Sequence, residues 1–230
     1  MLRYVITGAG RGIGRAIALK LARPDAKLYL LGRNMNALEE TCRAAQDKGA
    51  DACPVSADLG EAAGIDRAVA EIGPGMLHCL IHNAGVAFVA PFEQISLEQW
   101  HATLDVNVTA PFLLTQKLVP FMGEGSAIVS IISVAARTVF PQWGSYCMSK
   151  FALDGFSQVL REELRPRGIR VINIYPAATA TTMWDNVPGV WSADRMLSPA
   201  EVAEAVAYAL DRPASVLVDS ISVGRLSGNL

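Results

Sequence analysis

The chain has 230 residues, of which 51% are apolar and 18% are charged, and its formal net charge at pH 7 is -2. This composition excludes a disordered chain and offers no strongly basic surface for a nucleic acid. The length fits a single domain, residues 1–230, which can bury a sizeable core but leaves no room for a large second domain. We therefore expect a small molecule as the ligand.

The start of the chain, the cysteines and the histidines bear on localisation and metal chemistry. Met1–Arg3 leads directly into an apolar strand pattern that reaches Gly8, which leaves no room for a secretory signal. No uninterrupted apolar run reaches membrane-spanning length. The four cysteines and three histidines lack the spacing of metal ligands. These observations predict a cytoplasmic protein with reduced thiols, no metal site and no membrane segment.

Apolar strand-like runs alternate with helical patterns along the whole chain, which is typical of a parallel sheet covered by helices. Pro54 cannot donate to a strand ladder, so the third strand should lie at an edge of the sheet. The strand order 3-2-1-4-5-6 of a Rossmann-type fold places it there. The sequence predicts a doubly wound α/β fold with seven strands, at residues 3–7, 27–31, 52–55, 77–82, 127–132, 170–175 and 215–223.

A glycine-rich segment follows the first predicted strand and opens a helix. Gly8, Gly12 and Gly14 permit a tight turn, a close approach of the backbone to a pyrophosphate, and close packing of the helix. The backbone N–H groups and the helix dipole can then meet the phosphates. The predicted cofactor contacts of this segment are Gly8, Gly10, Arg11, Gly12, Ile13 and Gly14.

The end of the second strand decides which dinucleotide is bound. NAD-binding folds carry an Asp or Glu there for the ribose hydroxyls, but no carboxylate occurs between Asp25 and Glu39. The segment instead ends in Arg33-Asn34, and Arg33 and Arg11 could flank a ribose 2′-phosphate. We therefore predict NADP(H). The alternative is that both arginines are merely solvated and the cofactor is NAD(H).

Tyr146 and Lys150 are four residues apart and share one face of a predicted helix. A Lys ammonium at about 4 Å, with an effective dielectric of about 20, would stabilise a phenolate by roughly 4 kcal/mol, or about three pKa units. The pair predicts a Tyr poised for proton transfer near neutral pH. The alternative is a chance occurrence of the two residues at this spacing.

Further residues occur in a fixed order around this pair: Asp58-Leu59, Asn83-Ala84-Gly85, Asn107, and Ser133, which lies thirteen residues before Tyr146. With them the chain resembles the short-chain dehydrogenase/reductase family over nearly its whole length. The resemblance implies NAD(P)(H)-dependent interconversion of a carbonyl and an alcohol by hydride transfer. It also implies a homodimer or homotetramer.

The resemblance implies four catalytic residues. Tyr146 would be the general acid that protonates the carbonyl oxygen, and Ser133 would hold that oxygen. Lys150 would lower the pKa of Tyr146 and donate to the nicotinamide ribose. Asn107 would hold a water of a proton relay, and Pro111, which has no N–H, leaves the Asn107 carbonyl free to do so. The alternative is an ordinary proline kink with the Asn side chain in solvent.

The remaining cofactor contacts are also implied by the resemblance. Asp58 would bond the adenine amino group, and Leu59 beside it is a further predicted cofactor contact. The backbone at 83–85 would run close to the adenosine ribose. Pro176, Thr179 and Thr181 would lie near the nicotinamide; Thr181 best matches the carboxamide contact, although Thr179 and Thr182 stay open. Ala177 replaces the usual glycine, so the loop is expected to follow a different path.

A substrate pocket and its lid are expected before Tyr146 and in a loop of about residues 177–197. Trp143, Met183 and Trp184 are the predicted substrate contacts, and Val187, Val190, Trp191 and Met196 belong to the same apolar group. The alternative is that they pack the core or a subunit interface.

The sequence thus predicts an NADPH-dependent carbonyl reductase for a small ketone, aldehyde or secondary alcohol. The loop after Thr181 and the Met183-Trp184 pair are similar to those of sepiapterin-reductase-like and 3-hydroxy-acid-dehydrogenase-like enzymes. A 3-oxoacyl reductase or 3-hydroxy-acid dehydrogenase of the same family is one alternative. A catalytically silent NADPH-binding sensor is another.

Overall fold

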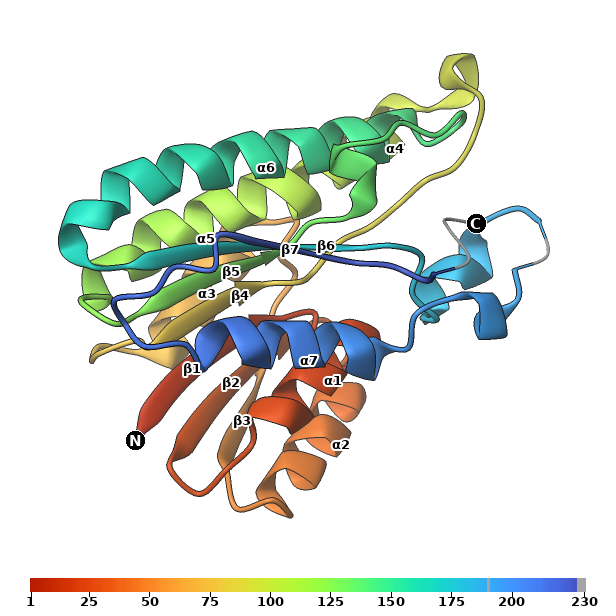
Figure 1. The fold of residues 1–230 in the computed structure, drawn as a ribbon. Coiled ribbons are helices and arrows are strands. Elements are labelled where there is room, and N and C mark those ends of the chain that lie inside the picture. Colours follow the sequence, from red (N-terminus) through yellow and green to blue (C-terminus); the bar gives the residue numbers. More distant parts are fainter. Residues whose placement is uncertain (190, 227–230) are drawn as a thin grey trace.

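The computed structural model describes residues 1–189 and 191–226, and within these residues seven parallel strands form one sheet (Figure 1). Its strand order is β3-β2-β1-β4-β5-β6-β7. The strands are β1 (Leu2–Thr7), β2 (Ala26–Gly32), β3 (Asp51–Ser56), β4 (Cys79–His82), β5 (Ala127–Ile131), β6 (Arg170–Pro176) and β7 (Ser220–Val223). The predicted Rossmann-type sheet is confirmed, and β3, which contains Pro54, lies at its edge.

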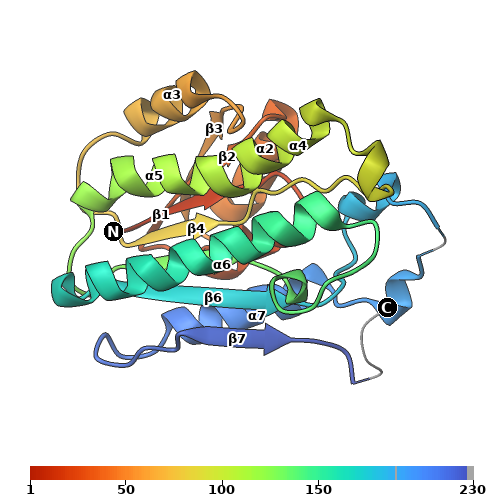
Figure 2. The same cartoon turned by 90° about the horizontal axis from the view of Figure 1, so that it is seen from above.

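Helices cover both faces of the sheet (Figures 1 and 2). One layer holds α1 (Gly12–Leu21), α2 (Met35–Gln46) and α7 (Pro199–Leu210), and the other holds α3 (Ala62–Ile72), α4 (Leu97–Leu104), α5 (Ala110–Leu118) and α6 (Gly144–Leu164). Neighbouring residues of β1 belong to different cores: Ile6 to the one with Ile17 of α1, and Val5 to the one with Leu114 of α5. The central strands β1, β2, β4, β5 and β6 are buried on both faces and largely apolar, whereas the edge strands β3 and β7 keep exposed polar residues.

The last strand is shorter than predicted. It begins at Ser220, where it pairs with Asn173 of β6, and not at residue 215. The N–H of Val216 instead donates to the carbonyl of Pro213, 2.8 Å away, which closes a turn after α7. An apolar run alone cannot distinguish a ladder strand from a segment that bonds locally, and here the turn takes residues that the pattern assigned to the strand.

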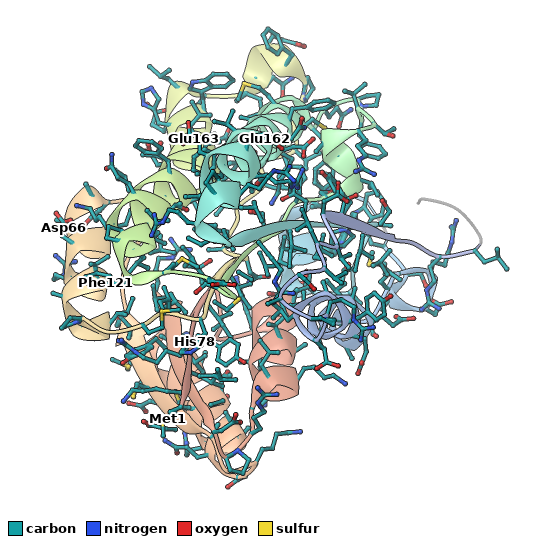
Figure 3. The ribbon with its side chains drawn as sticks, turned by 60° about the vertical axis from the view of Figure 1, so that its left-hand side comes forward. Met1, Asp66, His78, Phe121, Glu162 and Glu163 are labelled. Carbon is teal, nitrogen blue, oxygen red and sulfur yellow. The ribbon has the colours of Figure 1, made fainter. Side chains whose placement is uncertain are left out.

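The two ends of the sheet differ in what they carry. Met1 and His78, labelled in Figure 3, directly precede β1 and β4 and so mark the end of the sheet where the strands begin. Glu162 and Glu163, also labelled there, lie in the last turn of α6. The opposite end, where parallel strands finish, is where ligands bind in open α/β sheets. The chain between β6 and α7 extends beyond this end (Figure 1). None of the described helices is both long and apolar enough to cross a membrane.

Candidate active site

A cavity of about 900 Å³ opens at the carboxyl ends of the strands. Among the predicted site residues, Gly14 and Asn107 lie behind its wall. The others line it: Gly8, Gly10, Arg11, Gly12, Ile13, Arg33, Asn34, Asp58, Leu59, Asn83, Ala84, Gly85, Ser133, Trp143, Tyr146, Lys150, Pro176, Thr179, Thr181, Met183 and Trp184. The fold therefore brings residues from the whole length of the chain into one cleft.

The glycine positions between β1 and α1 leave little or no space for a side chain. Gly8 and Gly12 have φ angles of +65° and +54°, which other residues rarely adopt. A methyl group on Gly14 would lie 2.3 Å from the carbonyl oxygen of Gly8. Arg11 occupies the N-cap position of α1, but its side chain makes no capping hydrogen bond. The first N–H groups of the helix are therefore available to an anion. A dinucleotide pyrophosphate fits this cradle.

A clasp of hydrogen bonds, formed by Thr7 and Asn83, joins the ends of β1 and β4 under the loop. The Thr7 hydroxyl donates to the Ile81 carbonyl and accepts from the N–H groups of Asn83 (2.9 Å) and Ala84 (3.0 Å). The Asn83 amide donates to the carbonyls of Thr7 (2.8 Å) and Gly8 (3.2 Å). The Asn83 side chain thus holds the glycine loop.

The end of the cleft beside β2 carries two cations. Arg11 and Arg33 are exposed and line the cleft, and neither has an ion pair within the described residues. The Asn34 side chain accepts from the N–H of Ala37 and so caps α2. Asp58 accepts from the N–H of Gly60 at 2.9 Å. Two unpaired guanidinium groups and a carboxylate therefore face this end.

Helix α6 places Tyr146 and Lys150 at the centre of the cleft, where they are 8% and 3% exposed. The Lys150 ammonium donates to the Ile131 carbonyl at 3.0 Å and lies 5.6 Å from the centre of the Tyr146 ring. Ser133 follows the end of β5, and its hydroxyl accepts from the N–H of Ala135. The three side chains meet where β5 and the first turn of α6 converge.

The prediction that Lys150 lowers the pKa of Tyr146 is wrong for this structure. Burial raises the pKa of Tyr146 to about 12, and a hydrogen bond with Ser133 opposes this effect only in part. Burial also lowers the pKa of Lys150 to about 8. Both groups are desolvated, and the ammonium is directed to the Ile131 carbonyl. Tyr146 therefore keeps its proton at neutral pH.

Asn107 lies in a π-helical turn, Asp105–Thr109, between α4 and α5, and is 1% exposed. Its Oδ1 accepts from the N–H of Val86 and its Nδ2 donates to the Val86 carbonyl, both at 2.9 Å. Nδ2 also donates to the Ser149 hydroxyl at 2.9 Å. Ser149 in turn donates to the Tyr146 carbonyl at 2.7 Å. The alternative of an Asn side chain in solvent is excluded, since Asn107 is anchored to the helix that carries Tyr146.

The end of the cleft beyond Tyr146 carries four aromatic rings in a row. Trp143 meets the Tyr146 ring edge to face, with centroids 5.4 Å apart, and meets Trp184 at 5.7 Å. Trp184 meets Trp191 at 4.7 Å. The Trp184 indole N–H donates to the Thr179 carbonyl at 2.9 Å, which fixes its ring.

The other members of the predicted apolar group are divided between the cleft and the protein interior. Met183 and Trp191 line the cleft, whereas Val187 and Met196 are buried and do not line it. For those two residues the alternative of core packing holds. Val190 lies outside the described residues.

Comparisons with known proteins agree with this geometry. A family model described as short chain dehydrogenase matches residues 3–189. A sepiapterin reductase from Chlorobaculum tepidum is 33% identical over 237 residues, which cover 98% of this chain and 97% of that protein. The chain belongs to the short-chain dehydrogenase family. It is therefore an oxidoreductase that uses a nicotinamide dinucleotide, and the resemblance found in the sequence is confirmed.

Solved structures of short-chain dehydrogenases superpose over almost the entire chain. One from Burkholderia cenocepacia, in complex with NADP, has a TM-score of 0.86 at 29% identity and covers 97% of this chain, which in turn covers 96% of that chain. The landomycin C-6 ketoreductase with bound NADP and rabelomycin has a TM-score of 0.86 at 27% identity, with 97% and 94% covered.

The loop after β6 of this short-chain dehydrogenase accommodates Ala177 without a left-handed residue, since its φ is not positive. Ala177 donates its N–H to the Val223 carbonyl at 2.8 Å. The Thr179 hydroxyl is occupied with the Ala177 carbonyl, whereas Thr181 lies against the glycine loop: a methyl group on Gly12 would be 3.1 Å from its Cγ2. Of the two threonines, Thr181 is placed better for a cofactor contact.

Sequence reasoning missed several residues that position the site. Thr7 and Ser149 carry the hydrogen bonds that hold the glycine loop and Asn107. Gly64 at the start of α3 has no space for a methyl group, which would lie 2.1 Å from the Asp58 carbonyl. Only Gly64 gives a sequence signal, as a glycine inside a helix pattern. Among the described residues, no three metal-ligating side chains cluster.

Proposed function

We propose that this short-chain dehydrogenase is an NADPH-dependent carbonyl reductase, which transfers a hydride between the nicotinamide and a small ketone or aldehyde, or the corresponding secondary alcohol. The observation that carries the proposal is the buried phenol of Tyr146 beside Ser133 and Lys150 in the cleft that also carries the glycine loop. Its cytoplasmic location and its assembly as a homodimer or homotetramer are part of the same proposal.

The choice of NADP(H) rests on charge. Arg11 and Arg33 line the β2 end of the cleft without ion pairs among the described residues, and no carboxylate ends β2 to repel a 2′-phosphate. Planar guanidinium groups suit bidentate phosphate contacts. The structures from Burkholderia cenocepacia and of the ketoreductase, both with NADP, support the choice.

The chemistry assigned to the residues is proton donation and positioning. NADPH, when bound in this cleft, would supply the hydride that reduces the carbonyl carbon. As that C–H bond forms, the π electrons of the C=O bond move to oxygen, which takes the proton of Tyr146. Ser133 donates a hydrogen bond to the same oxygen. A phenol with a raised pKa stays protonated at neutral pH, which suits the reducing direction.

Lys150 and Asn107 have supporting roles in this proposal. The Lys150 ammonium would donate to the nicotinamide ribose, so its role is to position the cofactor beside Tyr146. The Asn107 carbonyl, which Pro111 cannot engage, accepts from a water in a relay that returns a proton. A silent NADPH sensor would need none of these groups, because binding alone requires no buried acid.

The cofactor assignment is tested by Arg33→Ala. We expect the ratio of kcat/KM for NADPH to that for NADH to fall at least tenfold, because a charge-assisted contact with the 2′-phosphate contributes about 1.5–3 kcal/mol. Arg15→Ala removes an exposed arginine of α1 that does not line the cleft, and it should leave the ratio unchanged. Equal dissociation constants of NADPH and NADH for the unmodified protein would refute the assignment.

The activity itself is tested by NADPH oxidation, followed at 340 nm, with pterins, diketones, quinones, aldehydes and 3-oxo esters. Turnover of at least one class is expected, and Tyr146→Phe should abolish it. Tight NADPH binding without turnover on any compound would favour the sensor. Turnover that Tyr146→Phe leaves unchanged would contradict the role of the phenol.

A further inference from the structure

The charges of the cleft are unevenly distributed. Its charged lining residues within the described chain are Arg11, Arg33 and Asp58, which lie at the β2 and β3 end, and Lys150. Lys150 is 3% exposed and already donates to the Ile131 carbonyl. The substrate end beyond Tyr146 is lined by apolar and neutral polar side chains: Phe88, Val89, Gln99, Phe140, Met183 and the tryptophans.

A charged substrate would be poorly accommodated at this end. A carboxylate or phosphate placed there would lose water and gain no cationic partner from the described lining residues. Gln99 offers an amide whose Nε2 can donate one hydrogen bond, but this group is neutral and cannot balance the charge of an anion. The surface therefore selects against 3-oxo acids and other anions near the reacting carbonyl.

The tryptophan row offers a surface for a flat ring. Trp143 contacts the Tyr146 ring itself, so a molecule against Trp143 lies beside the proton donor. Trp184 is held by its bond to the Thr179 carbonyl, and both indoles are half-buried with part of their surface open to the cleft. Rings fixed in this way can stack on an aromatic partner with little further loss of entropy.

We propose that the substrate is an uncharged ketone whose carbonyl is attached to, or lies within, a flat aromatic ring system, and that this ring packs against Trp143 and Trp184. The inference rests on the proposed carbonyl reductase activity and narrows it to one class of compound. The carbonyl is presented to Tyr146 and Ser133, and the rest of the ring extends towards Trp191 at the mouth of the cleft, where that side chain is 36% exposed.

The test compares ketones of similar size with NADPH: acetophenone, 2-acetylnaphthalene, cyclohexyl methyl ketone and 4-acetylbenzoate. Because these ketones differ in intrinsic reactivity, the informative quantity is the change that each variant causes. We expect Trp184→Leu to lower kcat/KM for 2-acetylnaphthalene at least tenfold and for cyclohexyl methyl ketone less than threefold. Trp184→Phe, which keeps a ring but loses the bond to the Thr179 carbonyl, should lower kcat/KM for 2-acetylnaphthalene less than Trp184→Leu does. The unmodified enzyme should use 4-acetylbenzoate at least tenfold less efficiently than acetophenone.

The control is Trp100→Leu in α4, a tryptophan outside the cleft lining, which should affect both ketones equally. Unchanged NADPH affinity in Trp184→Leu would show that the cofactor end is intact. Equal losses on aromatic and alicyclic ketones, or a preference for 4-acetylbenzoate, would overturn the inference while leaving the reductase activity standing. Failure of every ketone and every carbonyl class to oxidise NADPH would overturn the proposed function and the inference together.

Discussion

At the glycine loop the cleft is walled by main-chain atoms, whereas beyond Tyr146 it is walled by indole and phenyl rings. A methyl group on Gly8 or Gly14 would meet backbone or the Asn83 amide at less than 3.0 Å. The rings of Trp143 and Trp184 instead contact one another as side chains. A main-chain wall has the same shape for any sequence that folds in this way, so it suits a shared cofactor. A side-chain wall changes with each substitution and can therefore define the substrate.

The largest effect is expected where the main-chain wall is filled. Gly14→Ala puts a methyl group 2.3 Å from the Gly8 carbonyl, so α1 or the loop must shift. We expect a loss of about 3 kcal/mol in the free energy of unfolding, measured in urea, and loss of NADPH binding. Gly155→Ala in α6 is the matched control, because nothing lies within 4 Å of its added methyl group. That change should stabilise by about 0.5–1 kcal/mol.

The next prediction concerns how the stability of the fold depends on pH through Lys150, at the centre of the cleft. Its pKa is lowered to about 8 in the fold, while the unfolded chain keeps the ordinary value near 10.5. Between pH 8 and pH 10 the unfolded state binds more protons, so this group makes stability rise with pH, by about 2 kcal/mol. Above pH 10 the raised pKa of Tyr146 acts in the opposite direction, since the unfolded phenol ionises first.

The comparison with Lys150→Met isolates this contribution from other titrating groups. The difference in unfolding free energy between the unmodified protein and Lys150→Met, both without cofactor, should change by about 2 kcal/mol in favour of the unmodified protein from pH 8 to pH 10. Urea unfolding at the two pH values measures it. A difference that is independent of pH would show that Lys150 is not desolvated.

A similar loss of stability is expected at the Thr7 clasp. Thr7→Val keeps the shape but leaves the N–H groups of Asn83 and Ala84 without their acceptor. We expect a loss of about 2 kcal/mol in the free energy of unfolding and weaker NADPH binding. Thr103→Val removes one bond within α4, to the Gln99 carbonyl, and should cost less without changing NADPH affinity. Equal effects of the two variants would contradict the role of the clasp in holding the loop.

Much of the cofactor end was predictable from the sequence because its constraints are local. The spacing of Gly8, Gly12 and Gly14 after a strand reports a turn and a helix start, and Pro54 reports an edge. Hydrogen bonds between residues far apart in the chain cannot be recognised from the local sequence. Thr7 gives no sign that it meets the backbone 76 residues further along the chain.

At the end of the cleft that holds Tyr146 and the tryptophans, the sequence predicted which residues are present but not their pKa values. The spacing of Tyr146 and Lys150 correctly placed them together, yet their pKa values depend on burial by the rest of the fold. Pro111 indicated a disturbed helix, but the π-helical turn beside it needed the structure. Similarly, Val187 and Trp191 are both apolar residues of the predicted loop, but Val187 is buried whereas Trp191 lines the cleft.

The most direct test of the account is a single-turnover measurement of NADPH oxidation at saturating ketone, for the unmodified enzyme and for Tyr146→Phe at equal NADPH occupancy. The account predicts that the rate falls by about 10²–10⁴-fold, as expected for loss of a general acid, while the NADPH dissociation constant is unchanged. An equal rate in the two proteins would contradict it, because hydride transfer would then proceed without the proton of Tyr146.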